Sequence, residues 1–470
     1  MERTILVTGA TGYVGSKLIP LLLEKGQRVR VLARDPDRLL GHSWAAQVEV
    51  FRGDLLQEDS LSPALETVDA AYYLVHNMSS GLHYETREAE SARNFAAAAE
   101  QACLRQIIYL GGLAHPEEKI SSHMLSRLHT GEILRACQVP VTEFRASLII
   151  GAGSISFEMI RYLAEQLPLM VGPQNLKKLA QPIAVTDVLV YLLAALDTPA
   201  CLGGIYEIGG MDVLTYQEVM QVYARVRGLK RSLLVLPWMP LDLMALIAGI
   251  LTPVPAKIAR PLLGGMKSSS DVRSAAVETV FPDIHPKTYL ESVLRALDDL
   301  TPARLEFCWT PDTPLTRIRQ NGFFVDRREC KIDARPAAVF DVISGMGGRN
   351  GWPYLDGLWK LRGILDKLVG GPGLRGRKDA KSLNENDIVD YYRVEALEPG
   401  RRLLLKAELK SPGDGWMEWR VTPDGLGTKL TQTVFYAPRG LAGYIYWYAL
   451  WPVHTTVFTG LTRAITRGAK

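Results

Sequence analysis

The feature that most constrains the fold is a glycine-rich turn close to the N-terminus. Residues 4–8 are β-branched and apolar, as in a strand, and residues 13–26 carry apolar side chains at helical spacing. Between these segments, Gly9, Gly12 and Gly15 recur at every third position. In such a turn one glycine bends the chain, one admits a pyrophosphate and one lets the helix pack on the strand. The flanking strand and helix therefore predict a dinucleotide-binding turn, with an ordinary tight βα turn as the alternative.

Five further strand-like segments follow, and helical segments such as residues 87–103 separate them. The strand-like segments are residues 27–34, 48–55, 70–75, 105–112 and 141–151. Alternating strands and helices predict an α/β fold, a Rossmann-type doubly wound parallel sheet. A chain of 470 residues is long enough for more than one such domain.

The end of the second strand indicates which nicotinamide cofactor the turn prefers. Arg34 lies at this strand end, and Arg38 follows one helical turn later. An arginine here suits the 2′-phosphate of NADP, whereas an acidic residue binds the free ribose hydroxyls of NAD. We therefore expect NADP. Asp35 keeps NAD open as the alternative, and a solvated surface charge is the alternative for Arg38.

Four motifs together resemble a known family: residues 8–15 (TGATGYVG), 53–55 (GDL), 72–76 (YYLVH) and 181–188 (QPIAVTDV). The chain resembles an atypical short-chain dehydrogenase/reductase, and within that group the NmrA-like NAD(P)-binding proteins. The resemblance implies an NAD(P)-binding domain over residues 1–305, with a smaller substrate-side lobe at about residues 150–300. It also implies that Asp54 and Leu55 flank the adenine, and that Val75 and His76 line the cofactor near the fourth strand. The expected cofactor contacts are Gly9, Thr11, Gly12, Tyr13, Val14, Gly15, Arg34, Asp54, Leu55, Val75 and His76.

The catalytic residues of that superfamily are substituted in this chain. Active members use Ser, Tyr and Lys, and the tyrosine is the general acid or base. Aligning residues 126–128 places Arg127 at the lysine position and His123 at the tyrosine position, while Gly111 and Gly112 stand where the serine is expected. With an unperturbed pKa of about 6.5, His123 suits a general acid, and Arg127 suits ribose or phosphate binding. The alternative is that His123 is a surface residue of its helix.

The remaining composition argues against several classes of protein. The histidines at 76, 83, 123 and 129 lack the spacing of metal ligands, so we expect no metal site. A net charge of only +4 does not favour nucleic acid. The N-terminus carries no signal-peptide pattern. Five cysteines without CxxC spacing indicate reduced thiols of a cytoplasmic protein and no disulfide framework; they are Cys103, Cys137, Cys201, Cys308 and Cys330.

The pattern changes after residues 306–322, which are rich in Pro and Thr and predict a linker. Residues 323–346 suggest a strand and then a helix that starts at a proline. Strand-like segments joined by Pro-Gly and Pro-Asp-Gly turns follow, up to a long aromatic helix. This order resembles an α+β, START-like (SRPBCC, helix-grip) domain over residues 323–470. The resemblance implies a curved sheet around the last helix, with an apolar cavity for a hydrophobic small molecule.

One stretch raises the question of a membrane. Residues 440–462 contain no Asp, Glu, Lys or Arg and have the length of a spanning helix. Pro452 and His454 lower its hydrophobicity, and its aromatic residues lie in mid-span instead of in two belts. We expect a soluble, cytoplasmic protein. Membrane association through residues 440–462, as a peripheral contact, is the alternative.

Two functions remain open from the sequence. The first is an NADP-dependent oxidoreductase acting on a hydrophobic small molecule, either a carbonyl compound or a quinone-like compound. The second is a non-catalytic NADP(H) sensor, regulator or assembly factor. The missing Ser-Tyr-Lys set favours the second, and the attached ligand-type domain favours the first. The sequence does not indicate an oligomeric state.

Overall fold

The structure, a computed structural model, describes most of the chain in eight ranges. They are residues 2–39, 42–76, 84–251, 256–302, 318–320, 323–379, 382–425 and 427–469. The chain forms two units, one made mainly of residues 2–300 and the other mainly of residues 318–469. Most of the predicted linker, residues 306–322, lies outside the described residues, and so does Cys308.

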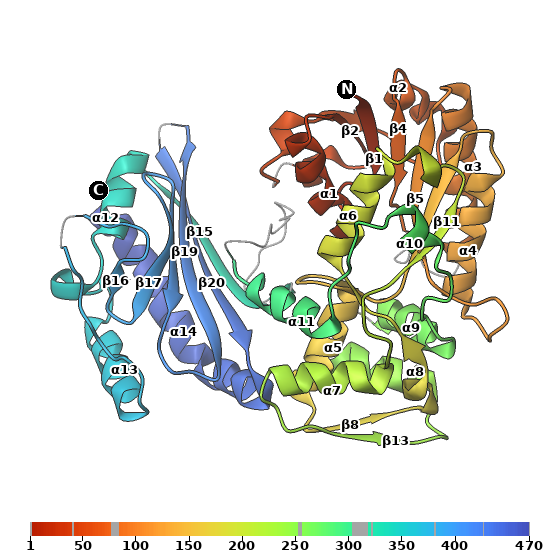
Figure 1. The fold of residues 1–470 in the computed structure, drawn as a ribbon. Coiled ribbons are helices and arrows are strands. Elements are labelled where there is room, and N and C mark those ends of the chain that lie inside the picture. Colours follow the sequence, from red (N-terminus) through yellow and green to blue (C-terminus); the bar gives the residue numbers. More distant parts are fainter. Residues whose placement is uncertain are drawn as a thin grey trace. The chain divides into compact units, whose positions relative to one another are not determined.

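A seven-stranded sheet with parallel neighbours is the framework of the first unit (Figure 1). Its order is β11-β6-β5-β4-β1-β2-β3, which confirms the predicted Rossmann-type fold. The strands are β1 (Thr4–Thr8), β2 (Arg28–Ala33), β3 (Glu49–Arg52), β4 (Ala70–Tyr73), β5 (Gln106–Gly112), β6 (Val141–Ala146) and β11 (Ile205–Ile208). The predicted strand at residues 141–151 is in fact two strands, β6 and the short β7 (Ile149–Ile150).

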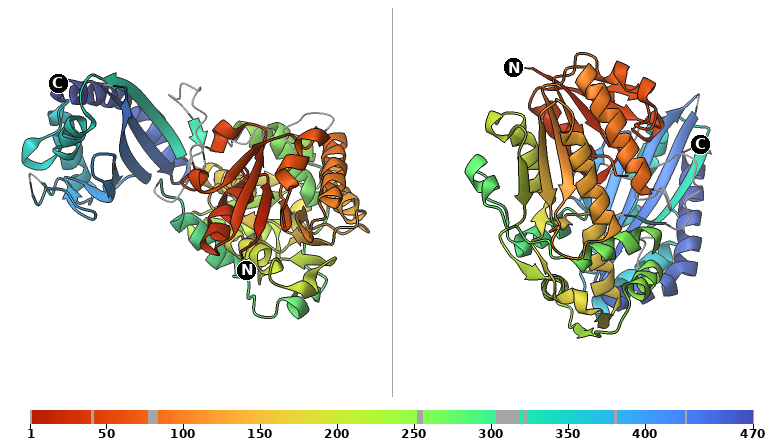
Figure 2. Two further views of the ribbon diagram at one scale, coloured as in Figure 1. Left: turned by 90° about the horizontal axis from the view of Figure 1, so that it is seen from above. Right: turned by 90° about the vertical axis from the view of Figure 1, so that its right-hand side faces the viewer.

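Helices cover both faces of this sheet, because side chains of successive strand residues point to opposite faces. Ile5 and Val7 of β1 belong to an apolar core with α1 and α6, whereas Leu6 belongs to a core with α2, α3 and α4. Figure 2 gives two further views of these layers. The helices are α1 (Tyr13–Glu24), α2 (Ser62–Leu65), α3 (Tyr84–Gln101), α4 (Ser122–Arg135), α5 (Ile155–Gln166), α6 (Val185–Ala195), α7 (Tyr216–Val226), α8 (Leu241–Leu251), α9 (Ala256–Gly264), α10 (Ala276–Val280) and α11 (Tyr289–Asp298).

The predicted lobe at residues 150–300 is only partly separate from the main sheet. β11 pairs with β6 at the sheet edge, and Val188 and Leu192 of α6 lie in the core of the main domain. These segments were expected in the lobe, and the structure corrects that assignment. The other strands of this region form two-stranded pairs: β7 with β10 (Ile183–Ala184), β8 (Leu169–Gly172) with β13 (Ser232–Val235), and β9 (Leu179–Ala180) with β12 (Leu214–Thr215).

In its described residues, the second unit is a seven-stranded antiparallel sheet with the α-helices α12, α13 and α14 (Figure 1). The strand order is β14-β15-β20-β19-β18-β17-β16. The elements are β14 (Ile318–Gln320), β15 (Phe323–Ile332), α12 (Pro336–Ser344), α13 (Asp356–Leu368), β16 (Ile388–Val389), β17 (Tyr392–Glu398), β18 (Arg402–Ala407), β19 (Gly413–Asp424), β20 (Gly427–Pro438) and α14 (Gly440–Gly468). The predicted order of strand, helix, antiparallel strands and terminal helix is confirmed, and α13 is an addition to it.

The terminal helix α14 packs on one face of this sheet. The Trp419 indole N–H donates to the Gln432 side chain over 3.0 Å, and the Gln432 amide donates to the Phe458 carbonyl of α14 over 3.2 Å. The Phe324 ring stacks on Trp447 with centroids 5.4 Å apart. The apolar side chains of residues 440–462 are thus partly used in packing. None of the helices within the described ranges has both the length and the apolar character that crossing a bilayer requires.

Candidate cofactor and active site

The glycine-rich turn joins β1 to α1 in the backbone shape that a dinucleotide requires. Gly9 has a φ of +74°, and a Cβ there would lie 2.7 Å from the Leu74 carbonyl oxygen. The Gly12 N–H donates to the Gly9 carbonyl over 2.8 Å, which closes the turn. Gly12 is the N-cap of α1, and no side chain caps the helix there. The first N–H groups of α1 are therefore available to phosphate oxygens.

A cavity of about 820 Å³ opens beside this turn. It lies at the carboxyl ends of β1 and β4, which are neighbours in the sheet although β2 and β3 come between them in sequence. Such a switch point is where parallel α/β sheets bind nucleotides. All thirteen candidate residues line the cavity: Gly9, Thr11, Gly12, Tyr13, Val14, Gly15, Arg34, Asp54, Leu55, Val75, His76, His123 and Arg127. The structure thus brings them together, and their individual contacts with a cofactor stay predictions.

The residues expected to select the cofactor lie at the rim of this cavity. Arg34, Asp35 and Arg38 line it and are exposed. Asp35 accepts a hydrogen bond from the Asp37 N–H over 3.3 Å. Within the described part of the chain, the side chains of Arg34 and Arg38 have neither a hydrogen bond nor an ion pair. Two guanidinium groups are therefore free to bind an anion at this end.

The segment expected at the adenine is held to the neighbouring helix. The Asn94 side-chain amide of α3 donates to the Leu55 carbonyl over 2.9 Å. The Asp54 carboxylate accepts the Leu56 N–H over 3.2 Å, and the Asp54 N–H donates to Ser60 Oγ over 3.0 Å. These bonds fix the backbone of residues 54–56 against the cavity.

A buried carboxylate, Glu88 of α3, anchors His76 at the other end of the cavity. Glu88 is 3% exposed and accepts hydrogen bonds from His76 Nδ1 and Ser126 Oγ. Burial raises the pKa of the Glu88 carboxyl, but the His76 hydrogen bond and the charges of His76 and Arg127 outweigh it and lower the pKa to about 2. Because Glu88 is then ionised, His76 Nδ1 carries the proton and the Nε2 atom is left for other contacts.

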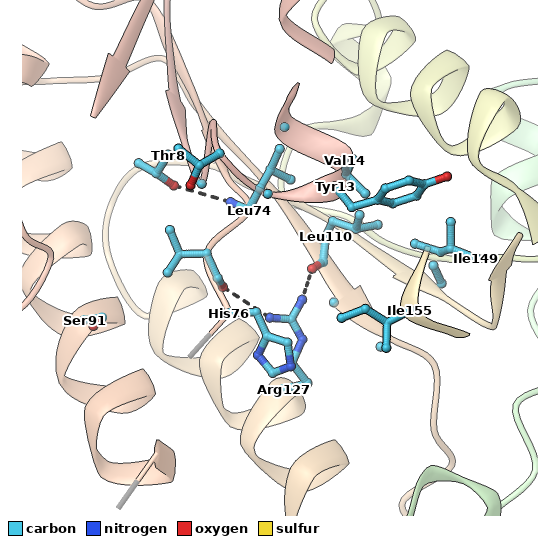
Figure 3. Close-up of a pocket in the computed structure, with 18 of the residues that line it drawn as sticks. Thr8, Tyr13, Val14, Leu74, His76, Ser91, Leu110, Arg127, Ile149 and Ile155 are labelled. Carbon is cyan, nitrogen blue, oxygen red and sulfur yellow. Dashed lines mark hydrogen bonds between the residues drawn. The ribbon is translucent and has the colours of Figure 1, made fainter. Parts of the chain in front are cut away.

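The Arg127 side chain links the ends of two strands. Its guanidinium donates to the Leu110 carbonyl of β5 and, over 3.4 Å, to the Val75 carbonyl that follows β4 (Figure 3). It also lies over the Tyr109 ring, 5.1 Å from the ring centre. Arg127 therefore occupies the cavity wall at the expected lysine position, with part of its hydrogen-bonding capacity used by the protein itself.

His123 is a buried residue of the cavity wall, so the interpretation as a surface helix residue is wrong. Ser121 caps α4, and His123 and Arg127 then fall four residues apart on one face of that helix. The His123 side chain is 7% exposed, and its ring centre lies 4.8 Å from that of His76. Its Nδ1 atom is buried and has no hydrogen-bond partner among the residues that the structure describes.

The protonation of His123 also differs from the prediction. Burial, followed by the charges of His76 and Arg127, lowers its pKa to about 3. Burial beside the Arg127 cation disfavours the imidazolium, so His123 does not keep the unperturbed pKa of about 6.5 that was assumed for a general acid. His123 is a neutral imidazole at physiological pH, which can donate or accept a hydrogen bond but holds no spare proton.

Several residues of this site were not predicted from the sequence. Glu88 and the cavity-lining Ser91 lie on the buried, alanine-rich face of α3. The presence of a carboxylate among apolar residues at helical spacing was the one sequence feature that could have indicated Glu88. Ser147, Tyr216 and Ser270, which come from later segments of the chain, also line the cavity. The Ser270 hydroxyl lies 2.9 Å from that of Ser147 and 3.4 Å from that of Tyr216. Each of these three residues lies more than 50 positions from the next in the sequence. No local sequence pattern therefore indicates that they meet in one cavity.

The Glu88 network gives a testable pH dependence of stability. A carboxyl whose pKa falls from 4.5 unfolded to about 2 folded stabilises the fold above the unfolded value, by up to about 3 kcal/mol. This contribution disappears as the pH drops from about 4.5 to about 2. We expect Glu88→Gln to lower the melting temperature clearly at pH 7, with the difference from wild type shrinking toward pH 3. Glu85→Gln, an exposed carboxylate in the same helix, is the control, and a pH-independent gap would contradict the role of Glu88.

Comparison with known proteins supports the family suggested by these motifs. The model of the NmrA-like family matches residues 1–263, and a model described as a protein of unknown function (DUF2867) matches residues 320–461. A ceramide reductase of Caulobacter vibrioides is 27% identical over 237 residues, which is 50% of this chain and 73% of that protein. A (4-alkanoyl-5-oxo-2,5-dihydrofuran-3-yl)methyl phosphate reductase of Streptomyces griseus is 29% identical over 292 residues, 60% of this chain and 92% of that protein.

Two further matches bear on the fold and on the range of functions. The structure of an Escherichia coli NADPH-dependent quinone oxidoreductase in complex with NADPH matches 62% of this chain and 99% of its own, with a TM-score of 0.51 and 19% identity. Such a likeness supports the fold. Subunit 9 of the mitochondrial NADH dehydrogenase [ubiquinone] 1 alpha subcomplex of Dictyostelium discoideum is 27% identical over 227 residues, 46% of this chain and 62% of that protein. The family model and the reductases together support an NAD(P)-binding oxidoreductase.

Proposed function

The chain belongs to the NmrA-like family, and from this premise we propose that it is an NADP(H)-dependent oxidoreductase that reduces a hydrophobic carbonyl or quinone-like compound. The observation that carries the proposal is the single cavity lined by all thirteen candidate residues. The cavity joins an uncapped helix N-terminus, a pair of free arginines and an apolar far end. These are the three features that a phosphorylated dinucleotide and an apolar substrate need together.

The residues of the cavity fit NADP(H). The uncapped N–H groups of α1 suit the diphosphate, Arg34 and Arg38 suit the 2′-phosphate, and Leu55 suits the adenine. When bound, this cofactor supplies a hydride. The protein must then place the substrate oxygen beside a hydrogen-bond donor, and His123 is the candidate for that donor.

The far end of the cavity is consistent with an apolar substrate that carries an oxygen. Leu148, Ile149, Ile155 and Leu262 contribute apolar surface. Tyr216 contributes a hydroxyl to the same cavity, together with Ser270, which is bonded to it, and Ser147, which is bonded to Ser270. The two reductases of this comparison act, by their names, on a ceramide and on an alkanoyl-furanone phosphate, and both names agree with an apolar substrate bearing oxygen.

The cofactor preference is tested by replacing Arg34. Because a charge-assisted hydrogen bond is worth about 1.5–3 kcal/mol, Arg34→Ala should weaken NADPH binding about 10- to 150-fold. NADH lacks the 2′-phosphate, so its dissociation constant should change less than about threefold. This limit corresponds to a change in binding free energy of about 0.6 kcal/mol. Calorimetric titration with both cofactors measures the two constants.

A matched control separates this contact from general electrostatics. Arg28 lies at the start of the same strand, β2, and is exposed outside the cavity. Arg28→Ala should leave both dissociation constants unchanged. Equal losses for NADPH and NADH in Arg34→Ala, or tighter NADH binding by the wild type, would assign the site to NAD through Asp35.

A non-catalytic NADP(H) sensor, regulator or assembly factor is the second candidate function. The residues at the tyrosine and lysine positions favour it, since His123 is neutral with a pKa of about 3 and Arg127 donates to the carbonyls of Val75 and Leu110. Neither is a ready proton donor. A relative that is named as a subunit of an NADH dehydrogenase agrees with such a role. Tight NADPH binding without oxidation by any carbonyl or quinone would select this function.

For the second unit, we propose a START-like helix-grip domain that holds a hydrophobic small molecule. The antiparallel sheet with α14 on one face supports this proposal. A cavity of about 360 Å³ within this unit, lined by α13, α14 and the sheet, supports it further, since ligand cavities of this size are common.

A further inference from the structure

The cavity of the second unit has an aromatic wall. It lies among α13, α14 and strands β17 to β20, and its volume is about 360 Å³. Nine Trp, Tyr and Phe side chains contribute to its lining: Trp359, Tyr391, Tyr392, Trp416, Phe435, Tyr436, Tyr446, Trp447 and Phe458. The Tyr436 and Trp447 rings stack at 5.3 Å, which gives the wall a flat apolar surface. Such a surface suits an apolar ring or chain.

The charge of this cavity is unbalanced. Of the described residues that line it, Arg362 of α13 is the one with a permanent charge, and none is an Asp or Glu. The Arg362 guanidinium donates to the Tyr446 hydroxyl over 3.1 Å and makes no ion pair within the described chain. Asp366, one turn later in α13, accepts the N–H groups of Gly373 and Lys410 instead. A half-buried cation thus faces the cavity without a matching anion.

Two further polar atoms of the lining are unpaired. Tyr436 is 4% exposed, and its hydroxyl is buried without a hydrogen-bond partner in the described part of the chain. The Nδ1 atom of His454 in α14 is likewise buried and unpaired. Burial, followed by the charges of Arg362 and Arg328, lowers the pKa of His454 to about 4, so the ring is neutral at pH 7. Unpaired buried groups cost free energy unless a ligand or water satisfies them.

From the unbalanced guanidinium in an aromatic cavity, we propose that this site binds an apolar small molecule with a single anionic group, which pairs with Arg362. The inference rests on the proposed ligand-binding function of this unit and adds the charge of the ligand. A carboxylate, sulfonate or phosphate oxygen can accept two N–H groups of one guanidinium, which gives the pair a defined geometry. The neutral His454 ring and Tyr436 hydroxyl add hydrogen-bonding capacity without adding charge.

The cavity also has an apolar entrance for such a molecule. Leu358, Leu361 and Leu365 of α13 and Val453 of α14 line the cavity and are between 41% and 49% exposed. Large apolar side chains are usually covered, so their exposure at one opening marks a contact surface. An apolar ligand that enters here passes Arg362, which lies on the same helix between Leu361 and Leu365.

A pair of fluorescent probes tests the charge. 1-Anilinonaphthalene-8-sulfonate carries an anionic group, and N-phenyl-1-naphthylamine has the same ring system without it. Both should bind the wild-type full chain with increased fluorescence. We expect Arg362→Met to weaken binding of the sulfonate at least tenfold and binding of the neutral probe less than twofold, as the loss of one charge-assisted contact predicts. Arg362→Lys keeps the charge and should retain most of the sulfonate affinity, which guards against a folding defect.

Two control variants identify the binding site. Lys367→Met removes an exposed cation of the same helix outside the cavity lining and should leave both probes unaffected. Val453→Trp should obstruct the entrance and weaken both probes. If Val453→Trp weakens both probes but Arg362→Met weakens neither, the cavity binds apolar ligands and the proposed anionic group is refuted. If neither probe responds to Val453→Trp, the ligand-binding function of this unit fails, and the inference fails with it.

Discussion

Replacing Gly12 with aspartate should weaken NADPH binding at least about 100-fold while leaving the first unit folded. Gly12 is the N-cap of α1, with φ −82° and ψ 167°, a conformation that any residue adopts. Aspartate is a preferred N-cap, so its carboxylate should bond to the free N–H groups of α1. It would then occupy the place predicted for the diphosphate and repel it. Losing one charged contact and gaining a like charge corresponds to about 2.7 kcal/mol or more.

The measurement combines calorimetric titration of NADPH with thermal unfolding. The melting temperature of Gly12→Asp should stay close to that of the wild type, because the new cap stabilises α1 while the added Cβ, 3.0 Å from the Gly9 carbonyl oxygen, crowds the turn. Gly26→Asn is the matched control at the far end of the same helix. Gly26 has a φ of +71° with no atom within 4 Å of an added Cβ, and asparagine tolerates this conformation. Unchanged NADPH affinity in Gly12→Asp would place the cofactor elsewhere and remove the main support for the proposed function.

The arrangement of the cofactor cavity was predictable because it depends on local motifs at strand ends. In a parallel sheet the carboxyl ends of all strands meet at one edge, so residues that follow different strands converge without any knowledge of packing. Gly9, Arg34, Asp54 and Val75 all lie at or just after such ends, and all line the cavity. His123 and Arg127 were predictable from another local rule, because residues four positions apart lie on the same face of a helix.

The properties that depend on tertiary neighbours were not predictable. The pKa of His123 follows from burial and from cations contributed by other segments, which a helical pattern does not reveal. The contact between Glu88 and His76 joins α3 to the end of β4, and β11 completes the main sheet from within the expected lobe. In the second unit, the exposed leucines of α13 form one stripe, at positions 358, 361, 365 and 368, whereas the buried positions are Trp359, Gly363 and Asp366. The apolar periodicity of this helix therefore does not mark the face that packs.

The other large effect is expected for His123→Ala, and it separates the two candidate functions. If the protein is a reductase, this variant should lower kcat/KM about 10²- to 10³-fold, the usual cost of removing one hydrogen-bond donor to a developing oxyanion. NADPH affinity should change less than about threefold, near 0.6 kcal/mol, because the predicted phosphate and adenine contacts lie on other segments. A panel of quinones and apolar carbonyl compounds, with NADPH oxidation followed by absorbance, provides the assay.

The pH dependence of that activity distinguishes the way in which His123 acts. Because its pKa is about 3, His123 stays neutral and would act by donating a hydrogen bond to the developing alkoxide, which would take its proton from solvent water. The wild type should therefore show no fall in kcat/KM from histidine ionisation between about pH 5 and pH 8. His129→Ala, an exposed histidine of the same helix, is the control and should be as active as the wild type. Robust turnover in His123→Ala would keep the enzyme and refute this role, whereas tight NADPH binding without turnover on the whole panel would establish the sensor function instead.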